Sequence, residues 1–197
     1  SHYTNDYFCI RSFNKLVTLN PYLICLSPKG DIDILKKTNM DNVQEFAWLE
    51  EISTDDFIFT FTPFQHWSAR WRFDRNESLW GGWFIKSNDY SLYHAGDTGY
   101  SNDFIETQKR LGSPKYAFLP IGAYDHEWFM AASQVNPEDS SRIMKDLGTE
   151  FRCVRHWGTL TLTAEDSLKP PKRLKDTHNH DKLDNFIKRT KGKGEEM

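Results

Sequence analysis

The sequence has few cysteines, and this shortage excludes one class of protein. Its 197 residues contain 3 cysteines, Cys9, Cys25 and Cys153, which lie far apart and form no CxxC pair. A disulfide framework is therefore excluded, and free, mostly buried thiols in a reducing compartment are the simpler interpretation. A zinc site built on thiolates is disfavoured for the same reason.

The sequence also lacks a positive surplus and a long apolar run. It has 25 Lys and Arg against 28 Asp and Glu, whereas a general nucleic-acid binder needs a basic excess to displace counterions. No run approaches the ~20 apolar residues of a membrane span. Hydrophobic residues make up only 38%, but aromatics reach 15%, and disordered chains are poor in aromatics. We therefore expect a folded domain with a slightly lean core.

Strand-like runs alternate with helical segments in a pattern typical of a layered α/β or α+β domain. The clearest helix start is Asn136 followed by Pro137, because Asn caps a first turn and Pro suits its first position. The Pro- and Lys-rich stretch 169–182 is interpreted as a surface connection. Strands are predicted at 22–26, 56–62, 78–86, 90–94, 116–120, 151–155 and 185–188, and helices at 31–38, 100–111 and 137–147.

Polar segments that could bind a metal follow these strands or precede the first of them. Imidazoles and carboxylates from separate loops are what a borderline metal such as zinc uses. Taken singly, each has an ordinary alternative: a lone His after a strand is more often structural, and Asp in Gly-Asp-Thr-Gly suits a tight turn. The segments are His2 with Asp6, QHW at 65–67, AGDTGY at 95–100 and HWGT at 156–159.

The order of these segments resembles the metallo-β-lactamase superfamily, within it the branch of phospholipases D that hydrolyse N-acyl-phosphatidylethanolamine. The resemblance implies a four-layer αββα sandwich, of class α+β, formed by one domain over residues 1–197. It also implies two zinc ions between the sheets. The matching segments are TPFQHWS at 62–68, SLWGGW at 78–83, AGDTGY at 95–100, LPIGAY at 119–124, WFM at 128–130, NPE at 136–138, HWGT at 156–159 and LKPP at 168–171.

The resemblance assigns roles to individual residues. It implies that His66 binds one zinc, that His156 binds the other and that Asp97 bridges them. His2 and Asp6 would complete the retained ligands, with Asp6 and Asp97 as the catalytic carboxylates. Water shared by two cations ionises near neutral pH, and the hydroxide would attack the phosphorus of a phosphodiester.

The leading motif of the family, His-x-His-x-Asp-His, is only partly present. His2 and Asp6 match in register, but Thr4 and Tyr7 stand at the other two histidine positions. By this alignment each zinc loses one imidazole. Three protein ligands and a water can still hold a catalytic zinc, although a weaker affinity is expected.

The expected substrate side differs from the branch as well. Gln134 stands where the branch has a histidine, and it could donate a hydrogen bond but carry no charge. Glu127 replaces a basic residue and would be less welcoming to an anionic head group. The resemblance assigns substrate binding to Gln134, Tyr124, Trp128 and Met130. An acyl groove lined by aromatic residues is a further interpretation, with ordinary core packing as the alternative for each of Trp67, Trp80, Trp83, Trp128, Phe129 and Met130.

These observations predict a zinc-dependent phosphodiesterase that releases N-acylethanolamine and phosphatidic acid. The first alternative is a catalytically impaired relative that binds lipid or a partner, as Thr4, Tyr7 and Gln134 suggest. The second is another hydrolase of the same fold, such as a lactonase or a nuclease. The expected partners are a phospholipid substrate, a membrane contacted peripherally and a second copy in a homodimer, with no nucleic acid. The expected location is intracellular, in the cytoplasm or on internal membranes.

The position of the metal motif predicts an N-terminally incomplete domain. The sequence begins with Ser1 rather than Met, and the resemblance starts almost at the metal motif, whereas about half of the sandwich precedes that motif in the family. A chain limited to residues 1–197 would expose a wide apolar sheet face, so we expect it to be unstable or to aggregate.

Overall fold

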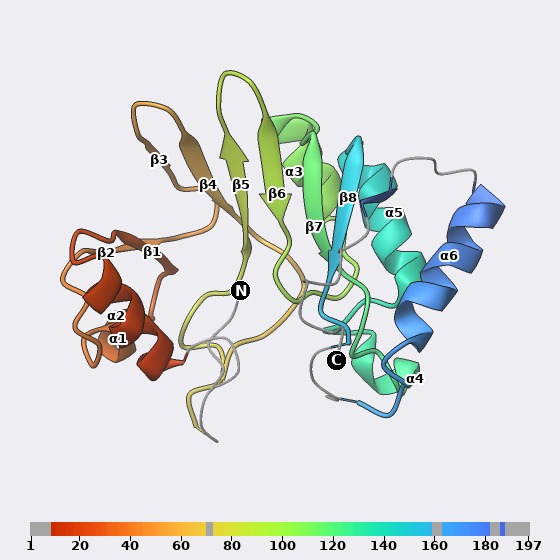
Figure 1. The fold of residues 1–197 in the computed structure, drawn as a ribbon, viewed down its shortest axis with the longest axis horizontal. Coiled ribbons are helices and arrows are strands. Elements are labelled where there is room, and N and C mark those ends of the chain that lie inside the picture. Colours follow the sequence, from red (N-terminus) through yellow and green to blue (C-terminus); the bar gives the residue numbers. More distant parts are fainter. Residues whose placement is uncertain (1–8, 70–72, 159–162, 182–185, 188–197) are drawn as a thin grey trace, which may run out of the picture.

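A computed structural model describes residues 9–69, 73–158, 163–181 and 186–187 (Figure 1). Its helices are α1 (Ile10–Leu19), α2 (Ile32–Leu35), α3 (Asp103–Leu111), α4 (Glu127–Met130), α5 (Pro137–Leu147) and α6 (Lys169–Asp181). Its strands are β1 (Cys25–Pro28), β2 (Val43–Phe46), β3 (Glu51–Ser53), β4 (Ile58–Thr62), β5 (Gly82–Lys86), β6 (Ser91–His94), β7 (Tyr116–Pro120), β8 (Phe151–Arg155) and β9 (Phe186–Ile187).

A seven-stranded sheet with the order β3-β4-β5-β6-β7-β8-β9 forms the centre of the described structure. Strands β3 to β6 are antiparallel neighbours, while β6, β7, β8 and β9 run parallel. The parallel steps need crossovers, and α3 and α5 supply them between β6, β7 and β8. Strands β1 and β2 form a separate two-stranded parallel sheet.

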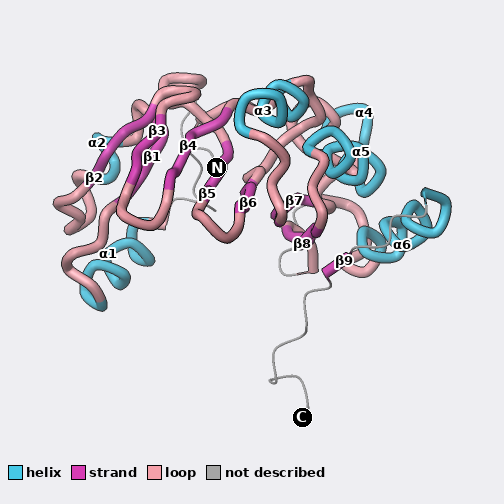
Figure 2. The backbone as a smooth tube through the Cα atoms, turned by 90° about the horizontal axis from the view of Figure 1, so that it is seen from above, coloured by secondary structure: helices cyan, strands magenta, loops and turns pink. Residues whose placement is uncertain are grey.

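One face of the large sheet is covered by α3 and α5 (Figure 2). Strand residues alternate between faces, so Phe84, Tyr93 and Leu119 all reach this side and are fully or almost fully buried. They belong to the main core together with Phe104 of α3 and Ile143 of α5. This side of the sheet therefore holds the main hydrophobic core.

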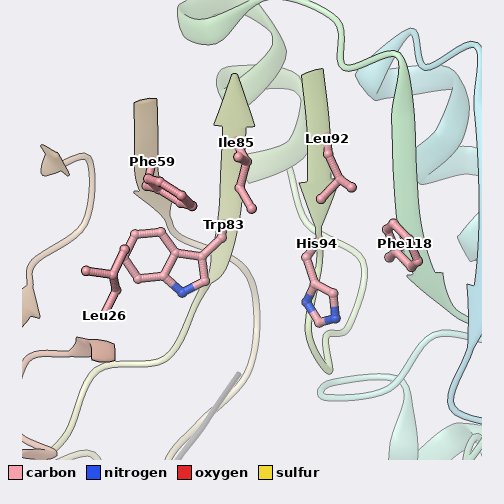
Figure 3. A pocket seen from close by; sticks show the side chains of 7 residues that line it. All are labelled: Leu26, Phe59, Trp83, Ile85, Leu92, His94 and Phe118. Carbon is pink, nitrogen blue, oxygen red and sulfur yellow. The ribbon is translucent and has the colours of Figure 1, made fainter. Parts of the chain in front are cut away.

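The other face of the sheet is apolar and open in the described residues. A hollow of about 340 Å³ lies on it, and Leu26 of β1 contributes to the lining from the small sheet (Figure 3). The αββα sandwich that the resemblance implies places its second sheet against this face, which accounts for its apolar character. The hollow is lined by Leu26, Phe59, Trp83, Ile85, Leu92, His94 and Phe118.

Strong local signals were enough to predict the second half of the sheet. Helix α5 begins after Asn136, whose side chain accepts a hydrogen bond from the backbone N–H of Asp139 at 2.8 Å, and it ends at Gly148 with φ 61°. Strands β7 and β8 have the predicted bounds, and the predicted hairpin is formed by β5 and β6. Strand β1 begins three residues later and ends two residues later than the predicted 22–26, and residues 78–81 precede β5 without being part of it.

The interpretation of residues 169–182 as a surface connection is wrong, because α6 spans Lys169–Asp181. Its prolines, Pro170 and Pro171, stand in the first turn, where a helix needs no amide donors and proline is tolerated. Leu174 of this helix is buried against Ile121 and Val154. Composition suggested a loop here, but burial of an apolar side chain stabilises a helix.

Two further expectations are corrected or limited by the structure. The thiols are free, but Cys9 is exposed and Cys25 and Cys153 are only half-buried, so they are not mostly buried as expected. Burial and the nearby Asp31 raise the pKa of Cys25 to about 11, so this thiol is unreactive near neutral pH.

None of the helices within the described ranges is both long and apolar enough to span a membrane.

Candidate active site

The candidate site lies at the edge of the sheet where several strands end. His66 follows β4, Asp97 follows β6 and His156 follows β8. Strands β6 and β8 are both parallel to β7, and β4 runs in the same direction because it is two antiparallel steps from β6. All three segments therefore leave the sheet at the same edge, as the sequence predicted.

Backbone contacts join the loop of His66 to the loop of Asp97. The carbonyl of Gln65 accepts hydrogen bonds from the Gly99 N–H at 2.8 Å and from the Thr98 hydroxyl at 3.3 Å. The Gln65 side chain donates to the carbonyl of Ala132 at 3.0 Å. A Cβ atom at Gly99 would lie 2.8 Å from the carbonyl oxygen of Ala131, so glycine allows this close approach. The loops after β4, after β6 and after α4 thus form one packed unit.

Asp97 is the buried acidic group of the site, with only 2% of its surface exposed. Its Oδ2 lies 3.3 Å from Nε2 of His156, and its Oδ1 lies 3.7 Å from Nη1 of Arg155. Arg155 also donates a hydrogen bond to the carbonyl of Gly96 at 2.6 Å. A buried carboxylate is costly unless positive charge and hydrogen-bond donors surround it, and Arg155 meets that need from the end of β8, two strands away from β6.

The orientation of His156 is fixed from its far side. Its Nδ1 lies 3.2 Å from the carbonyl oxygen of Gly122, and a carbonyl can only accept, so Nδ1 carries the hydrogen. In the neutral ring, the lone pair of Nε2 then faces the carboxylate of Asp97. Two acceptors 3.3 Å apart repel each other unless a proton or a metal cation lies with them. The pair therefore fits a cation in its donor chemistry.

His66 is the third predicted ligand, and it lies in the same electrostatic environment. Burial lowers its pKa, while the backbone of Trp67 and the charge of Asp97 oppose this shift. Its Nδ1 lies 2.7 Å from the carbonyl oxygen of Trp67. The neutral imidazole favoured by burial is the form that binds metal ions.

The predicted metal ligands do not form a complete group within the described residues. Within these ranges, no three His, Cys, Asp or Glu side chains form a group that could hold a metal ion. His2, Thr4, Asp6 and Tyr7 lie outside the described residues. Asp97 and His156 are brought together as predicted, and the ligand roles of the whole set stay predictions.

The residues predicted to bind substrate lie in different environments. Gln134 and Tyr124 are buried, Met130 is half-buried, and Trp128 is 85% exposed. The Oε1 atom of Gln134 has no hydrogen-bond partner in the part of the chain that the structure describes. The aromatic set does not form one wall, because Trp83 lines the open sheet face whereas Trp80 packs against the main core.

The charge of Glu127, which seemed unfavourable for an anionic head group, is paired. Glu127 forms a short ion pair with Arg173 of α6, and its other oxygen accepts from the Asn136 side chain at 3.1 Å. Arg173 also pairs with Glu138 at 2.7 Å and lies over the ring of Tyr124, 5.1 Å from its centroid. Sequence reasoning missed these ion pairs of Arg173, because residues 169–182 were interpreted as a surface connection.

Comparison with known proteins supports this architecture. A family model described as a beta-lactamase superfamily domain matches residues 23–157. A metallo hydrolase from Ignicoccus hospitalis superposes with a TM-score of 0.74 at 19% identity, covering 97% of this chain and 74% of that one. An isothiocyanate hydrolase from Delia radicum gut bacteria has a TM-score of 0.61 at 18% identity, covering 82% and 62%. The α+β fold predicted from the sequence is confirmed.

Two curated relatives indicate which branch of the superfamily the chain is similar to. A mitochondrial N-acyl-phosphatidylethanolamine-hydrolysing phospholipase D from Saccharomyces cerevisiae is 36% identical over 75% of this chain and 33% of its own length. An N-acyl-phosphatidylethanolamine-hydrolysing phospholipase D 1 from Caenorhabditis elegans is 29% identical over 89% of this chain and 52% of its own length. The chain thus spans a third to about half of these relatives. It belongs to the metallo-β-lactamase superfamily, is a hydrolase by resemblance, and is similar to the branch that hydrolyses N-acyl-phosphatidylethanolamine.

Proposed function

We propose that the chain is part of a zinc-dependent phosphodiesterase of the phospholipase D type. Its substrate would be N-acyl-phosphatidylethanolamine, and its products N-acylethanolamine and phosphatidic acid. The observation that carries the proposal is the buried Asp97 carboxylate facing Nε2 of His156 at 3.3 Å, at a strand-end edge. The chain is similar to relatives described as phospholipases D that hydrolyse N-acyl-phosphatidylethanolamine, and this similarity supplies the substrate class.

The protein residues have separate tasks in this proposal. Asp97, His156 and His66 would hold zinc together with His2 and Asp6, and the bound metal would supply a hydroxide and offset phosphoryl charge. Arg155 stabilises the ionised form of Asp97 by its charge. The Gly122 carbonyl keeps Nδ1 of His156 protonated, which directs Nε2 toward the carboxylate. Gln134 would offer an amide donor to a phosphoryl oxygen without adding charge.

The proposed partner surface is a membrane contacted peripherally from inside the cell. Trp128 and Phe129 of α4 are 85% and 69% exposed, and their ring centroids lie 5.8 Å apart. Aromatic side chains favour the boundary between lipid head groups and acyl chains, so this pair is suited to that contact. Lys169 begins the neighbouring helix α6, but its ammonium group lies 3.9 Å from the Asp125 carboxylate, so the aromatic pair and not this charge carries the proposed contact.

A catalytically impaired lipid-binding relative is the second candidate. Thr4 and Tyr7 replace two histidines of the family motif. The described residues also form no complete group of metal ligands. Under this alternative the aromatic pair would still bind lipid, but metal and turnover would be absent.

The two candidates are separated by zinc content and hydrolysis, both measured on the full-length protein. The enzyme proposal expects bound zinc and release of N-acylethanolamine, with both lost in Asp97→Asn. Asp89→Asn, in the exposed turn between β5 and β6, serves as the control and should change neither. Wild-type protein without zinc or turnover would exclude the enzyme. Restored zinc binding in a Thr4→His and Tyr7→His variant would then identify the missing ligands as the cause.

A further inference from the structure

Glu165 makes an unusual set of contacts with the loop that follows β7. Its carboxylate accepts hydrogen bonds from three successive backbone N–H groups, including those of Tyr124 at 3.3 Å and Asp125 at 3.2 Å. The third donor is the N–H of Ala123, and the Thr163 hydroxyl donates a short bond to the same carboxylate. We infer that Glu165 is a positioning residue of the candidate active site, acting through residues 122–125 on His156.

The loop that Glu165 holds is strained and needs a fixed partner. Ala123 has φ 66°, in the left-handed region that is unfavourable for a residue with a side chain. Three converging N–H groups bind an anion better than a neutral acceptor, because each hydrogen bond to a charged group is stronger. The Glu165 carboxylate thus compensates for the strained backbone of the loop.

Movement of this loop would be transmitted directly to His156. The Gly122 carbonyl is the acceptor for Nδ1 of His156 at 3.2 Å. The backbones of Gly122 and His156 are also packed closely, since a Cβ atom on Gly122 would lie 2.2 Å from the carbonyl oxygen of His156. The two segments are in close contact, so displacement of residues 122–125 must shift the imidazole of His156 or break its hydrogen bond to Gly122.

The hydrogen bonds of Glu165 also outweigh the effect of its burial. Burial alone would raise the pKa of this carboxyl, but Thr163 and the loop N–H groups together hold the pKa below its ordinary value. Glu165 is therefore charged near neutral pH, the state in which it accepts all of these bonds. Geometry and charge agree on its role as an anchor for the loop.

Loss of the anchor should weaken the site without removing any predicted ligand. When the carbonyl that holds a ligating histidine is displaced, the ring can rotate or change tautomer, and such losses reduce metal affinity about 10-fold. This consequence rests on the proposed function, because it needs a metal at His156. The coupling between Glu165 and His156 does not.

Glu45 provides a matched control for Glu165. Its carboxylate also accepts two backbone N–H groups, from Gly30 at 2.8 Å and Ile32 at 2.9 Å, next to the small sheet. Glu45→Ala therefore removes the same kind of contact away from the site. Glu165→Gln is the milder companion of Glu165→Ala, because an amide keeps one acceptor oxygen and turns the other position into a donor.

The test uses full-length wild-type protein, both alanine variants and Glu165→Gln. Zinc alone is titrated, the absorption spectrum of the cobalt-substituted protein is recorded, and hydrogen exchange is measured over residues 155–158. We expect about 10-fold weaker zinc binding, an altered cobalt spectrum and faster exchange for Glu165→Ala, a smaller change for Glu165→Gln, and wild-type behaviour at this site for Glu45→Ala.

The outcomes separate the inference from the proposed function. Equal behaviour of Glu165→Ala and Glu45→Ala would overturn the positioning role, and so would wild-type zinc affinity in Glu165→Ala. If wild-type protein binds no zinc, the proposed function is wrong. The inference is then decided by exchange alone, which supports it only if Glu165→Ala accelerates exchange over residues 155–158 and Glu45→Ala does not.

Discussion

Substituting alanine for Gly122 should damage the site more than the fold. The added Cβ would lie 2.2 Å from the carbonyl oxygen of His156, whereas ordinary contact begins at 3.4 Å, so the segments must separate by about 1.2 Å. The same separation lengthens the 3.2 Å bond from His156 to the Gly122 carbonyl beyond hydrogen-bonding distance. A misplacement of about 1 Å in a catalytic arrangement can cost roughly 100-fold in rate.

The assay is turnover of N-acyl-phosphatidylethanolamine by full-length protein at saturating substrate, with thermal unfolding recorded alongside. We expect kcat to fall by about 100-fold. Gly112→Ala is the control, because a Cβ there meets no atom within 4 Å, although its φ of 89° disfavours a side chain. It should lower the unfolding temperature and leave kcat unchanged. A Gly122→Ala protein with wild-type kcat would refute the argument that this contact positions His156.

Three further outcomes are expected. Asn136→Ala should lower the free energy of unfolding by about 1 kcal/mol in urea titrations, whereas Asn102→Ala should change it little, since only Asn136 caps its helix through its side chain. The hydrogen bond from Arg173 lowers the pKa of Glu127, so their pairing stabilises the fold above the unfolded pKa of about 4.3 and is lost as pH falls through the lower folded value. Unfolding temperatures recorded from neutral to acidic pH should therefore show a shallower acid decline for Glu127→Gln, and an unchanged decline would contradict this. Trp128→Ala should reduce the fraction of protein that sediments with phospholipid vesicles. Tyr22 is 84% exposed in the wild type, and Tyr22→Ala should leave that fraction unchanged.

Elements with strong local signals could be predicted closely. Helix α5 has a capping Asn136 and a terminal Gly148, and each signal depends on a few adjacent residues. Helix α6 has no such signal: its early prolines and charged residues are typical of loops, and its stability comes from burial of Leu174 against other elements. A contact of that kind depends on tertiary structure, which the sequence pattern does not reveal.

In the candidate site, too, some features could be predicted from the sequence, whereas others depend on tertiary contacts. The family resemblance implied that Asp97 and His156 would meet, and the structure explains why, because β6 and β8 run in the same direction and end at the same edge. Glu165 could not be predicted, since it acts on backbone N–H groups roughly forty residues away, and such contacts require no particular residue type at the partner positions. The pairing of Glu127 with Arg173 was missed because it depends on α6 being a helix.

The open apolar face and the candidate site are physically connected through His94. This residue lines the apolar hollow, its ring stacks on Phe118, and its Nδ1 accepts a hydrogen bond from the Gly96 N–H, next to Asp97 (Figure 3). Burial lowers the pKa of His94 to about 4, so a neutral ring separates the apolar face from the charged edge. In the αββα sandwich that the resemblance implies, a second sheet would cover this face and exclude water from the hollow beside His94, and charge interactions at the edge would then become stronger. The electrostatics of the site would in that case depend on packing over the whole sheet and not only on the ligand residues.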